Sequence, residues 1–121
     1  MTQPCRILLV EDSPEDYEII RYNLKKGGLD ADIVRVETES EYVERLAAGG
    51  VDVVLSDANL PRFSGREALE VRNRLAPLVP FILVSGAVGD EMAVEFLRNG
   101  CVDYVLKEKL TRLPSAVTRA V

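Results

Sequence analysis

The chain has 121 residues, 47% of them hydrophobic, which is enough to bury one substantial core. Its 15 basic and 20 acidic residues give a net charge of −5, which argues against direct nucleic-acid binding because phosphate backbones are held by clustered Lys and Arg. The absence of histidine excludes a Ser/His/Asp triad and a histidine metal site. No apolar run approaches the roughly 20 residues that cross a bilayer, and the first residues lack signal-peptide character, so we expect a cytoplasmic protein without a membrane partner.

The first predicted elements are a strand over residues 6–10 and the helix that follows it. Ser13 is a typical helix N-cap, Pro14 fits the first turn, and Asp16 fits the acidic third position. Two glycines at positions 27–28 end this helix. The chain therefore passes from a buried strand through a short turn into a well-capped helix.

Strand and helix patterns then alternate to the end of the chain. Further strands are expected at residues 31–36, 51–56, 80–85 and 102–106. The remaining helices are expected to begin near Thr38, Gly65, Asp90 and Thr111. The last helix has Pro114 in its first turn and is still helical in pattern at Val121, so residues 1–121 are predicted to be one domain cut from a longer chain.

This alternation predicts an α/β fold, a doubly wound parallel sheet of five strands with helices on both faces, because a parallel crossover needs about a dozen residues. The runs at 51–56 and 80–85 are apolar almost throughout, as central strands covered on both faces should be. Cys5 and Cys101 fall where strands begin and match no metal-ligand spacing, so both are predicted to be reduced structural thiols.

Polar residues stand where the predicted strands end. The carboxyl ends of parallel strands lie along one edge of a sheet, and ligands bind there near the point where strand order reverses. The residues at these ends are Glu11, Asp12, Asp57, Ser85 and Lys107. Taken singly, Ser85 fits an ordinary turn hydroxyl and Lys107 a solvated lysine, so a functional interpretation depends on the combination.

Three of these residues, Glu11, Asp12 and Asp57, would bring carboxylates together, where like charges raise each other's pKa unless a cation compensates. Carboxylates with a backbone carbonyl and several waters favour Mg²⁺. Helix capping is the alternative for Glu11 and Asp12, since acids stabilise first turns by up to about 1 kcal/mol. That alternative does not cover Asp57, which stands away from an obvious helix start.

A hydroxyl, an ammonium group and a metal ion around one carboxylate would suit phosphoryl transfer, because charge spreads over the transferring oxygens. In such a site Asp57 would be the nucleophile, with Ser85 and Lys107 beside it. Since the chain has no histidine, any phosphohistidine must belong to a partner.

Four segments together resemble the receiver domain of two-component response regulators, over essentially the whole chain. They are "LLVEDSPED", "VVLSDANLPRFSG" with its D-x-x-x-P-x-x-x-G loop, "ILVSGA" and "DYVLK". Each segment is weak alone, but four in this order at these spacings are specific. The resemblance implies a flavodoxin-like three-layer sandwich with strand order 2-1-3-4-5, and a phosphorylation-dependent switch in a phosphorelay.

The resemblance also implies roles for the acidic residues. Asp57 would be the phosphoacceptor, and Asp12 the principal Mg²⁺ ligand. Glu11 would act on the metal largely through water, and Asn59 would offer its backbone carbonyl. These roles make Mg²⁺ the expected cofactor.

The other strand-end residues would act on the phosphoryl group and on the switch. Ser85 would bond a phosphoryl oxygen, and Lys107 would pair with the phosphate, or with Asp57 in its absence. Tyr104 would turn inward as Ser85 moves, although its pattern alone fits a half-buried strand residue. Asn59 and Ala87 would control the access of water to the phosphoaspartate.

The sequence departs from the family at Glu108, where a cis-proline usually follows the lysine. A non-proline cis bond costs about 2.5–4 kcal/mol, so a trans bond and a differently shaped loop are expected. A receiver that only docks to partners, without phosphorylation, therefore stays open as the alternative. A flavodoxin-like cofactor binder would need a first loop rich in Gly, Ser and Thr, and a Mg²⁺-dependent phosphatase or nuclease would need a second nucleophile or base.

The implied partners are a histidine kinase or a histidine phosphotransfer protein. The ending "LKEKLTRLPSAVTRAV" is similar to receivers fused to sensor or kinase modules, and a fused output module or a weak homodimer would also fit. The domain is expected to assist its own phosphorylation and dephosphorylation and not to be a turnover enzyme.

Overall fold

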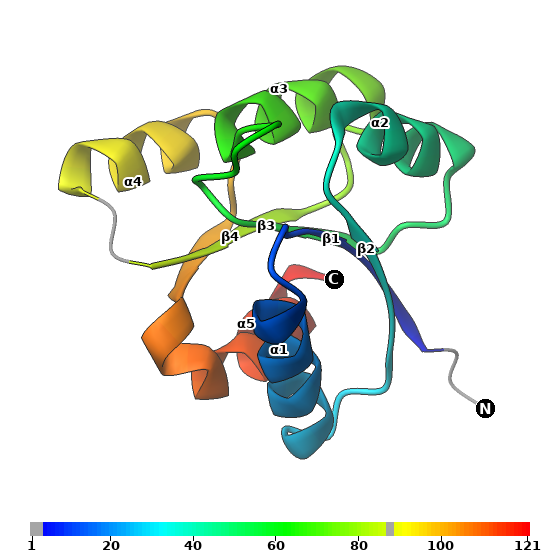
Figure 1. Cartoon of the computed structure of the whole chain (residues 1–121), viewed down its shortest axis with the longest axis vertical. Coiled ribbons are helices and arrows are strands. Elements are labelled where there is room, and N and C mark those ends of the chain that lie inside the picture. The colour runs from blue at the N-terminus through cyan, green and yellow to red at the C-terminus, as the bar shows by residue number, and fades with distance from the viewer. Residues whose placement is uncertain (1–3, 87–88) are drawn as a thin grey trace.

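Strands and helices alternate along residues 4–86 and 89–121, which the computed structural model describes (Figure 1). The strands are β1 (Cys5–Val10), β2 (Ala31–Val36), β3 (Val53–Ser56), β4 (Phe81–Ser85) and β5 (Asp103–Leu106). The helices are α1 (Pro14–Lys26), α2 (Glu39–Ala48), α3 (Gly65–Leu75), α4 (Asp90–Arg98), the 3₁₀ helix η1 (Lys107–Arg112) and α5 (Leu113–Ala120). Within this described part of the chain, no helix has the length and apolar character needed to span a membrane.

The strands form one parallel sheet in the order β2-β1-β3-β4-β5, which confirms the predicted doubly wound fold. Figure 1 shows α2, α3 and α4 on one face of the sheet and α1 and α5 on the other. The strand order reverses beside β1, so the edge at the carboxyl ends of β1 and β3 is where a ligand site is expected.

The core consists of two apolar layers, one on each face of the sheet. In β1, Leu8 and Val10 point toward the layer under α2, α3 and α4, whereas Ile7 and Leu9 belong to the layer with α1 and α5. This alternation follows from the two-residue period of a strand. The two cysteines, Cys5 and Cys101, are free as predicted and belong to opposite layers.

Side-chain caps fix the starts of the first three helices, as the sequence predicts for α1. Ser13 Oγ accepts a hydrogen bond from the Asp16 N–H at 3.1 Å. Thr38 and Ser64 each form a capping box with the glutamate three residues later. Such caps satisfy free N–H groups of the first turn, so the strand-to-helix turns at the site are well defined.

The prediction for the last helix was wrong at its start, because α5 begins at Leu113 and not near Thr111. A 3₁₀ segment with a kink at Lys109 occupies residues 107–112 instead. Leu110 is buried, and Arg112 Nη2 donates hydrogen bonds to the Tyr104 carbonyl at 2.7 Å and to Asp103 Oδ1 at 3.0 Å. These contacts hold the segment against β5 before α5 starts, with Pro114 in the first turn of α5 as predicted.

A buried arginine closes the opposite edge of the sheet, where the strands begin. Arg72 of α3 donates to the carbonyls of Pro77 and Val79, both at 3.1 Å, and to that of Gly100 at 2.8 Å. Burial lowers the pKa of its guanidinium. This side chain therefore ties the loop before β4 to the turn before β5.

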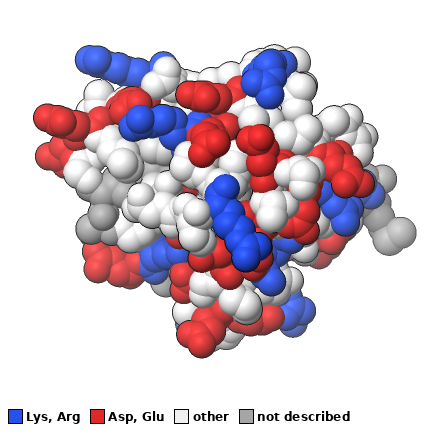
Figure 2. Space-filling view, turned by 45° about the horizontal axis from the view of Figure 1, so that its top comes forward, with Lys and Arg blue, Asp and Glu red and all other residues white. Residues whose placement is uncertain are grey.

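Charged side chains of both signs are interspersed on the face drawn in Figure 2. Lys and Arg do not form a continuous patch among the described residues visible there. The negative net charge of the chain is thus accompanied by a mixed surface on this side.

Candidate functional site

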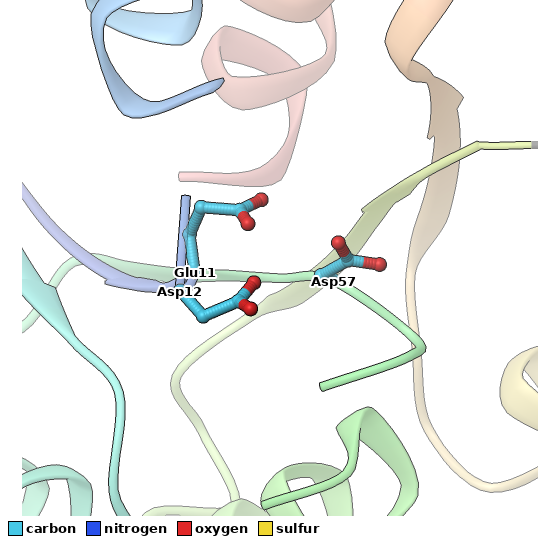
Figure 3. Close-up of side chains that lie close together, drawn as sticks. All are labelled: Glu11, Asp12 and Asp57. Atoms are coloured by element: carbon cyan, nitrogen blue, oxygen red, sulfur yellow. The ribbon is translucent and has the colours of Figure 1, made fainter. Parts of the chain in front are cut away.

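The five predicted site residues lie together at the carboxyl edge of the sheet. Glu11 and Asp12 follow β1, and Asp57 follows β3, the neighbouring strand (Figure 3). Ser85 is the last residue of β4, and Lys107 comes directly after β5. Parallel pairing places these strand ends along one edge, so residues from four segments meet there.

The three carboxylates of Glu11, Asp12 and Asp57 form one cluster in which an oxygen of each lies within 4.8 Å of the others (Figure 3). Glu11 is 1% exposed and Asp57 8%, whereas Asp12 is open to solvent. Three hard oxygen donors at this spacing, one of them accessible, suit a Mg²⁺ ion that keeps several waters.

Both carboxylate oxygens of Asp57 accept hydrogen bonds. Ser85 Oγ donates to Oδ1 at 2.7 Å, and the Asn59 backbone N–H donates to the same oxygen at 3.2 Å. Lys107 Nζ donates to Oδ2 at 2.8 Å. Burial raises the pKa of Asp57, but these hydrogen bonds outweigh it, and the pKa lies below its ordinary value. The carboxylate is therefore ionised and oriented at neutral pH.

Lys107 is paired with three carboxylates. Its Nζ lies 2.7 Å from Glu11 Oε2, 2.7 Å from Asp16 Oδ2 and 2.8 Å from Asp57 Oδ2. Burial lowers the pKa of this ammonium group, but the three carboxylates more than offset it and hold the pKa above its usual value. The lysine is thus a fixed positive charge beside Asp57.

Asp16 is the residue at this site that sequence reasoning missed. Its place in the first turn of α1 was interpreted as helix capping alone, yet its carboxylate binds Lys107. The turn after β1 ends at the same sheet edge as the other site residues. An acidic residue in the first turn of the following helix was therefore a usable signal.

The charge balance of the site favours a cation. Among the described residues, the site combines four carboxylates, three of them paired with Lys107 and the fourth that of Asp12, with the single ammonium group of Lys107. Burial raises the pKa of Glu11, and the Lys107 ammonium group and a hydrogen bond from the Ser13 N–H only partly offset this rise. A divalent ion would reduce the remaining repulsion, so the residues present fit Mg²⁺.

The structure explains why glycine occupies the last position of the D-x-x-x-P-x-x-x-G loop, which is Gly65. It is the first residue of α3, and its N–H donates to the Ala58 carbonyl at 3.2 Å. A Cβ at this position would lie 2.4 Å from the Asp57 carbonyl oxygen and 2.9 Å from the Ala58 Cα. Only glycine allows the start of α3 to pack directly against the backbone of Asp57.

Two further predicted residues lie close to this edge. Tyr104 is half-buried in β5, and its hydroxyl donates to the Gly86 carbonyl at 2.8 Å, directly after Ser85. Asn59 follows Asp57 in the loop before α3, and Ala87 lies outside the described residues. The described peptide bonds include no cis bond, so the bond between Lys107 and Glu108 is trans, as predicted.

A doubly wound parallel sheet with an acidic cluster, a hydroxyl and an ammonium group at its carboxyl edge places the chain among flavodoxin-like α/β proteins. Within that class, the family model for the response regulator receiver domain matches residues 7–118. The chain therefore belongs to the response regulator receiver domain family.

Curated relatives contain this domain as part of longer proteins. The chain is 30% identical over 103 residues to the response regulator protein FleR of Pseudomonas aeruginosa, covering 85% of the chain but 21% of FleR. It is 31% identical over 121 residues to a protein-glutamate methylesterase/protein-glutamine glutaminase of Geobacter metallireducens, covering 90% of the chain and 30% of that protein. The chain thus spans less than a third of either relative.

Solved structures with the same fold include receiver domains of histidine kinases. One is the receiver domain of a sensor histidine kinase from Pseudomonas aeruginosa PAO1, solved with a magnesium ion in its active-site cleft, with 25% identity, a TM-score of 0.81 and 97% of each chain covered. Another is from a signal transduction histidine kinase of Syntrophus aciditrophicus, with 27% identity, a TM-score of 0.79, and 96% of this chain and 89% of that chain covered.

Proposed function

We propose that this domain is a phosphorylation-dependent signalling switch that takes a phosphoryl group from a phosphohistidine onto Asp57. The observation that carries the proposal is the setting of Asp57, a largely buried, ionised carboxylate with Ser85 on one oxygen and Lys107 on the other. Since the chain has no histidine, the donor is a histidine kinase or a histidine phosphotransfer protein.

The proposed transfer uses the groups around Asp57 directly. A carboxylate oxygen of Asp57 forms a bond to phosphorus while the phosphorus–nitrogen bond of the donor breaks, and the imidazole leaves with the electron pair and takes up a proton. Ser85 Oγ and Lys107 Nζ already lie at hydrogen-bond distance from Asp57, so each can move its hydrogen bond to a phosphoryl oxygen. Donors aimed at developing charge are an effective source of rate enhancement.

Four residues would hold Mg²⁺ at this site. Asp12 would be the principal ligand because it is exposed, with Asp57 beside it, the Asn59 backbone carbonyl as a further ligand, and the buried Glu11 acting largely through water. When bound, Mg²⁺ neutralises negative charge on the transferring oxygens. The magnesium ion in the related kinase receiver supports this choice of metal.

The switch would operate through the strand ends next to Asp57. Movement of Ser85 toward a phosphoryl oxygen would pull on Gly86, whose carbonyl holds the Tyr104 hydroxyl, and Tyr104 would turn inward. Partner affinity would then change on the surface of α4, β5 and α5. Phosphate can shift these populations only as far as it stabilises one state over the other.

The cellular setting follows from the same proposal. The domain would act in the cytoplasm within a phosphorelay, fused to a sensor, kinase or output module as in its longer relatives, or as a weak homodimer. It would assist its own phosphorylation and dephosphorylation, with Asn59 and Ala87 limiting the access of water, and would not be a turnover enzyme. The alternative is a docking module that works without phosphorylation.

Acetyl phosphate tests the proposed chemistry. With Mg²⁺, the wild-type domain is expected to gain the mass of one phosphoryl group in intact mass spectrometry, and the adduct should be acid-stable and base-labile. Asp57→Asn, which keeps the size of the side chain, should gain none, and EDTA should prevent the gain in wild type. Equal uptake by Asp57→Asn would refute Asp57 as the acceptor.

Beryllofluoride tests the switch against the docking alternative. Added with Mg²⁺, it is expected to change the NMR signal of Tyr104, because it takes the place of the phosphoryl group on Asp57. Tyr104→Phe assigns the signal, and Tyr42, buried on the same side of the sheet, is an internal control that should not move. An unchanged Tyr104 signal would favour docking without phosphorylation.

A further inference from the structure

Asp16 lies at the site without belonging to the acidic cluster. Its backbone N–H is held by Ser13 Oγ at 3.1 Å, which fixes the first turn of α1. Its carboxylate Oδ2 accepts a hydrogen bond from Lys107 Nζ at 2.7 Å, across 91 residues of sequence. It is absent from the group formed by Glu11, Asp12 and Asp57.

The three partners of Lys107 differ in what they must do during the proposed reaction. Lys107 Nζ donates hydrogen bonds to Asp16 Oδ2 at 2.7 Å and to Asp57 Oδ2 at 2.8 Å, and it forms an ion pair with Glu11 Oε2 at 2.7 Å. Asp57 Oδ2 is part of the acceptor itself, and Glu11 belongs to the metal cluster. Asp16 is the one partner of the three that takes part neither in accepting the phosphoryl group nor in the metal cluster.

We infer that Asp16 is a positioning residue that holds Lys107 Nζ beside Asp57 while its other partners change, an inference that rests on the proposed function. When an Asp57 oxygen bonds to phosphorus and the bond from phosphorus to the leaving group breaks, the ammonium must pass from Asp57 to a phosphoryl oxygen. The ammonium group of Lys107 stands at the end of a flexible four-carbon stem. The next residue in the chain, Glu108, is exposed. The bond to Asp16, which comes from a capped helix, keeps the ammonium in place during this exchange.

Helix capping alone does not account for the position of Asp16. Glu15 occupies the same first turn and offers the same negative charge to the helix N-terminus. Glu15 is exposed and makes no ion pair within residues 4–86 and 89–121. A comparison of the two residues therefore separates a general effect on α1 from an effect on Lys107.

The test measures the rate of phosphorylation by acetyl phosphate with Mg²⁺, first in the wild-type protein and then in the Lys107→Met variant. Asp16→Ala is expected to slow the reaction about tenfold, since small misplacements of a catalytic group can cost up to about a hundredfold. Glu15→Ala should stay within about twofold of wild type, and Asp16→Glu should recover part of the rate. In a Lys107→Met background, Asp16→Ala should cause no further loss. An equal loss in both backgrounds, or a wild-type rate for Asp16→Ala, would overturn the inference.

A second measurement keeps this result apart from a failure of the proposed function. The Lys107 ammonium protons are expected to give a sharp NMR signal in wild type and Glu15→Ala, without any phosphoryl donor, and to lose it in Asp16→Ala. Retention of the signal in Asp16→Ala would refute the anchoring. If Asp16→Ala loses the signal but wild type is not phosphorylated, the proposed function is refuted while the contact between Asp16 and Lys107 stands.

Discussion

Lys107→Met is expected to slow phosphorylation of Asp57 by acetyl phosphate about 100-fold, the usual scale for removing a donor aimed at developing charge. Methionine keeps much of the stem but lacks the ammonium group that now lies 2.8 Å from Asp57 Oδ2. The negative charge that develops on the phosphoryl oxygens would lose its nearest protein cation. Rates from intact mass spectrometry at fixed Mg²⁺ would measure the effect.

The same substitution is also expected to destabilise the fold. Glu11 and Asp57 are both buried and would face each other without their shared lysine, at a cost of about 3 kcal/mol in the free energy of unfolding. Mg²⁺ should restore more stability to Lys107→Met than it adds to wild type, because the ion takes over the role of countercharge. Urea unfolding with and without Mg²⁺ measures both effects.

Lys109→Met provides the matched control for Lys107→Met. Lys109 is exposed at a kink within the segment 107–112 and makes no ion pair among the described residues. The Lys109→Met variant should be phosphorylated at the wild-type rate and should have the wild-type free energy of unfolding. A Lys107→Met rate within about threefold of wild type would contradict the role given to this lysine.

Gly65→Ala is expected to lower the free energy of unfolding by about 1–3 kcal/mol, although alanine is the better helix former. The added methyl carbon would lie 2.4 Å from the Asp57 carbonyl oxygen, a contact with backbone that no side-chain rotation can relieve. Either α3 or the Asp57 loop must shift, so phosphorylation should slow as well. Chemical unfolding and the acetyl phosphate assay measure the two effects.

Gly89→Ala separates this clash from a general effect of adding a methyl group. Gly89 precedes α4, and among the described residues a Cβ there would meet no atom within 4 Å apart from those of its chain neighbours. Its cost should be about 1 kcal/mol or less, since alanine is only a poorer N-cap. The prediction for Gly65 fails if the two variants lose equal stability.

The sequence was sufficient to predict the sheet because its signals are local and repeated. Apolar strand segments recur along the chain, glycines end α1 and α2, and side-chain N-caps such as Ser13 begin the first three helices. Parallel pairing follows from the alternation of strands and helices. The same rule brings Asp57, Ser85 and Lys107 to one edge, since each stands at a strand end. The strand order itself came from the family resemblance.

Contacts made by long side chains could not be predicted in the same way. The place of Lys107 in the chain indicates an edge of the sheet, and the family resemblance implies its pairing with Asp57. Its contacts with Glu11 and Asp16 depend on the path of a four-carbon stem. The 3₁₀ helix was missed for a related reason, because the burial of Leu110 and the hydrogen bonds of Arg112 to β5 override the helical pattern there. Both depend on tertiary contacts between distant segments.

The hydrogen bonds of Arg72 lie at the edge where the strands begin, opposite to the edge that carries Asp57. The partners of Arg72 are backbone carbonyls, which do not titrate at physiological pH and do not accept a phosphoryl group, so neither process acts directly on these hydrogen bonds. The hydrogen bonds of Arg72 hold two loops together at one edge, whereas the hydrogen bonds of Asp57 at the other edge would change on phosphorylation. A displacement that starts at Asp57 is therefore expected to leave the hydrogen bonds of Arg72 to Pro77, Val79 and Gly100 in place.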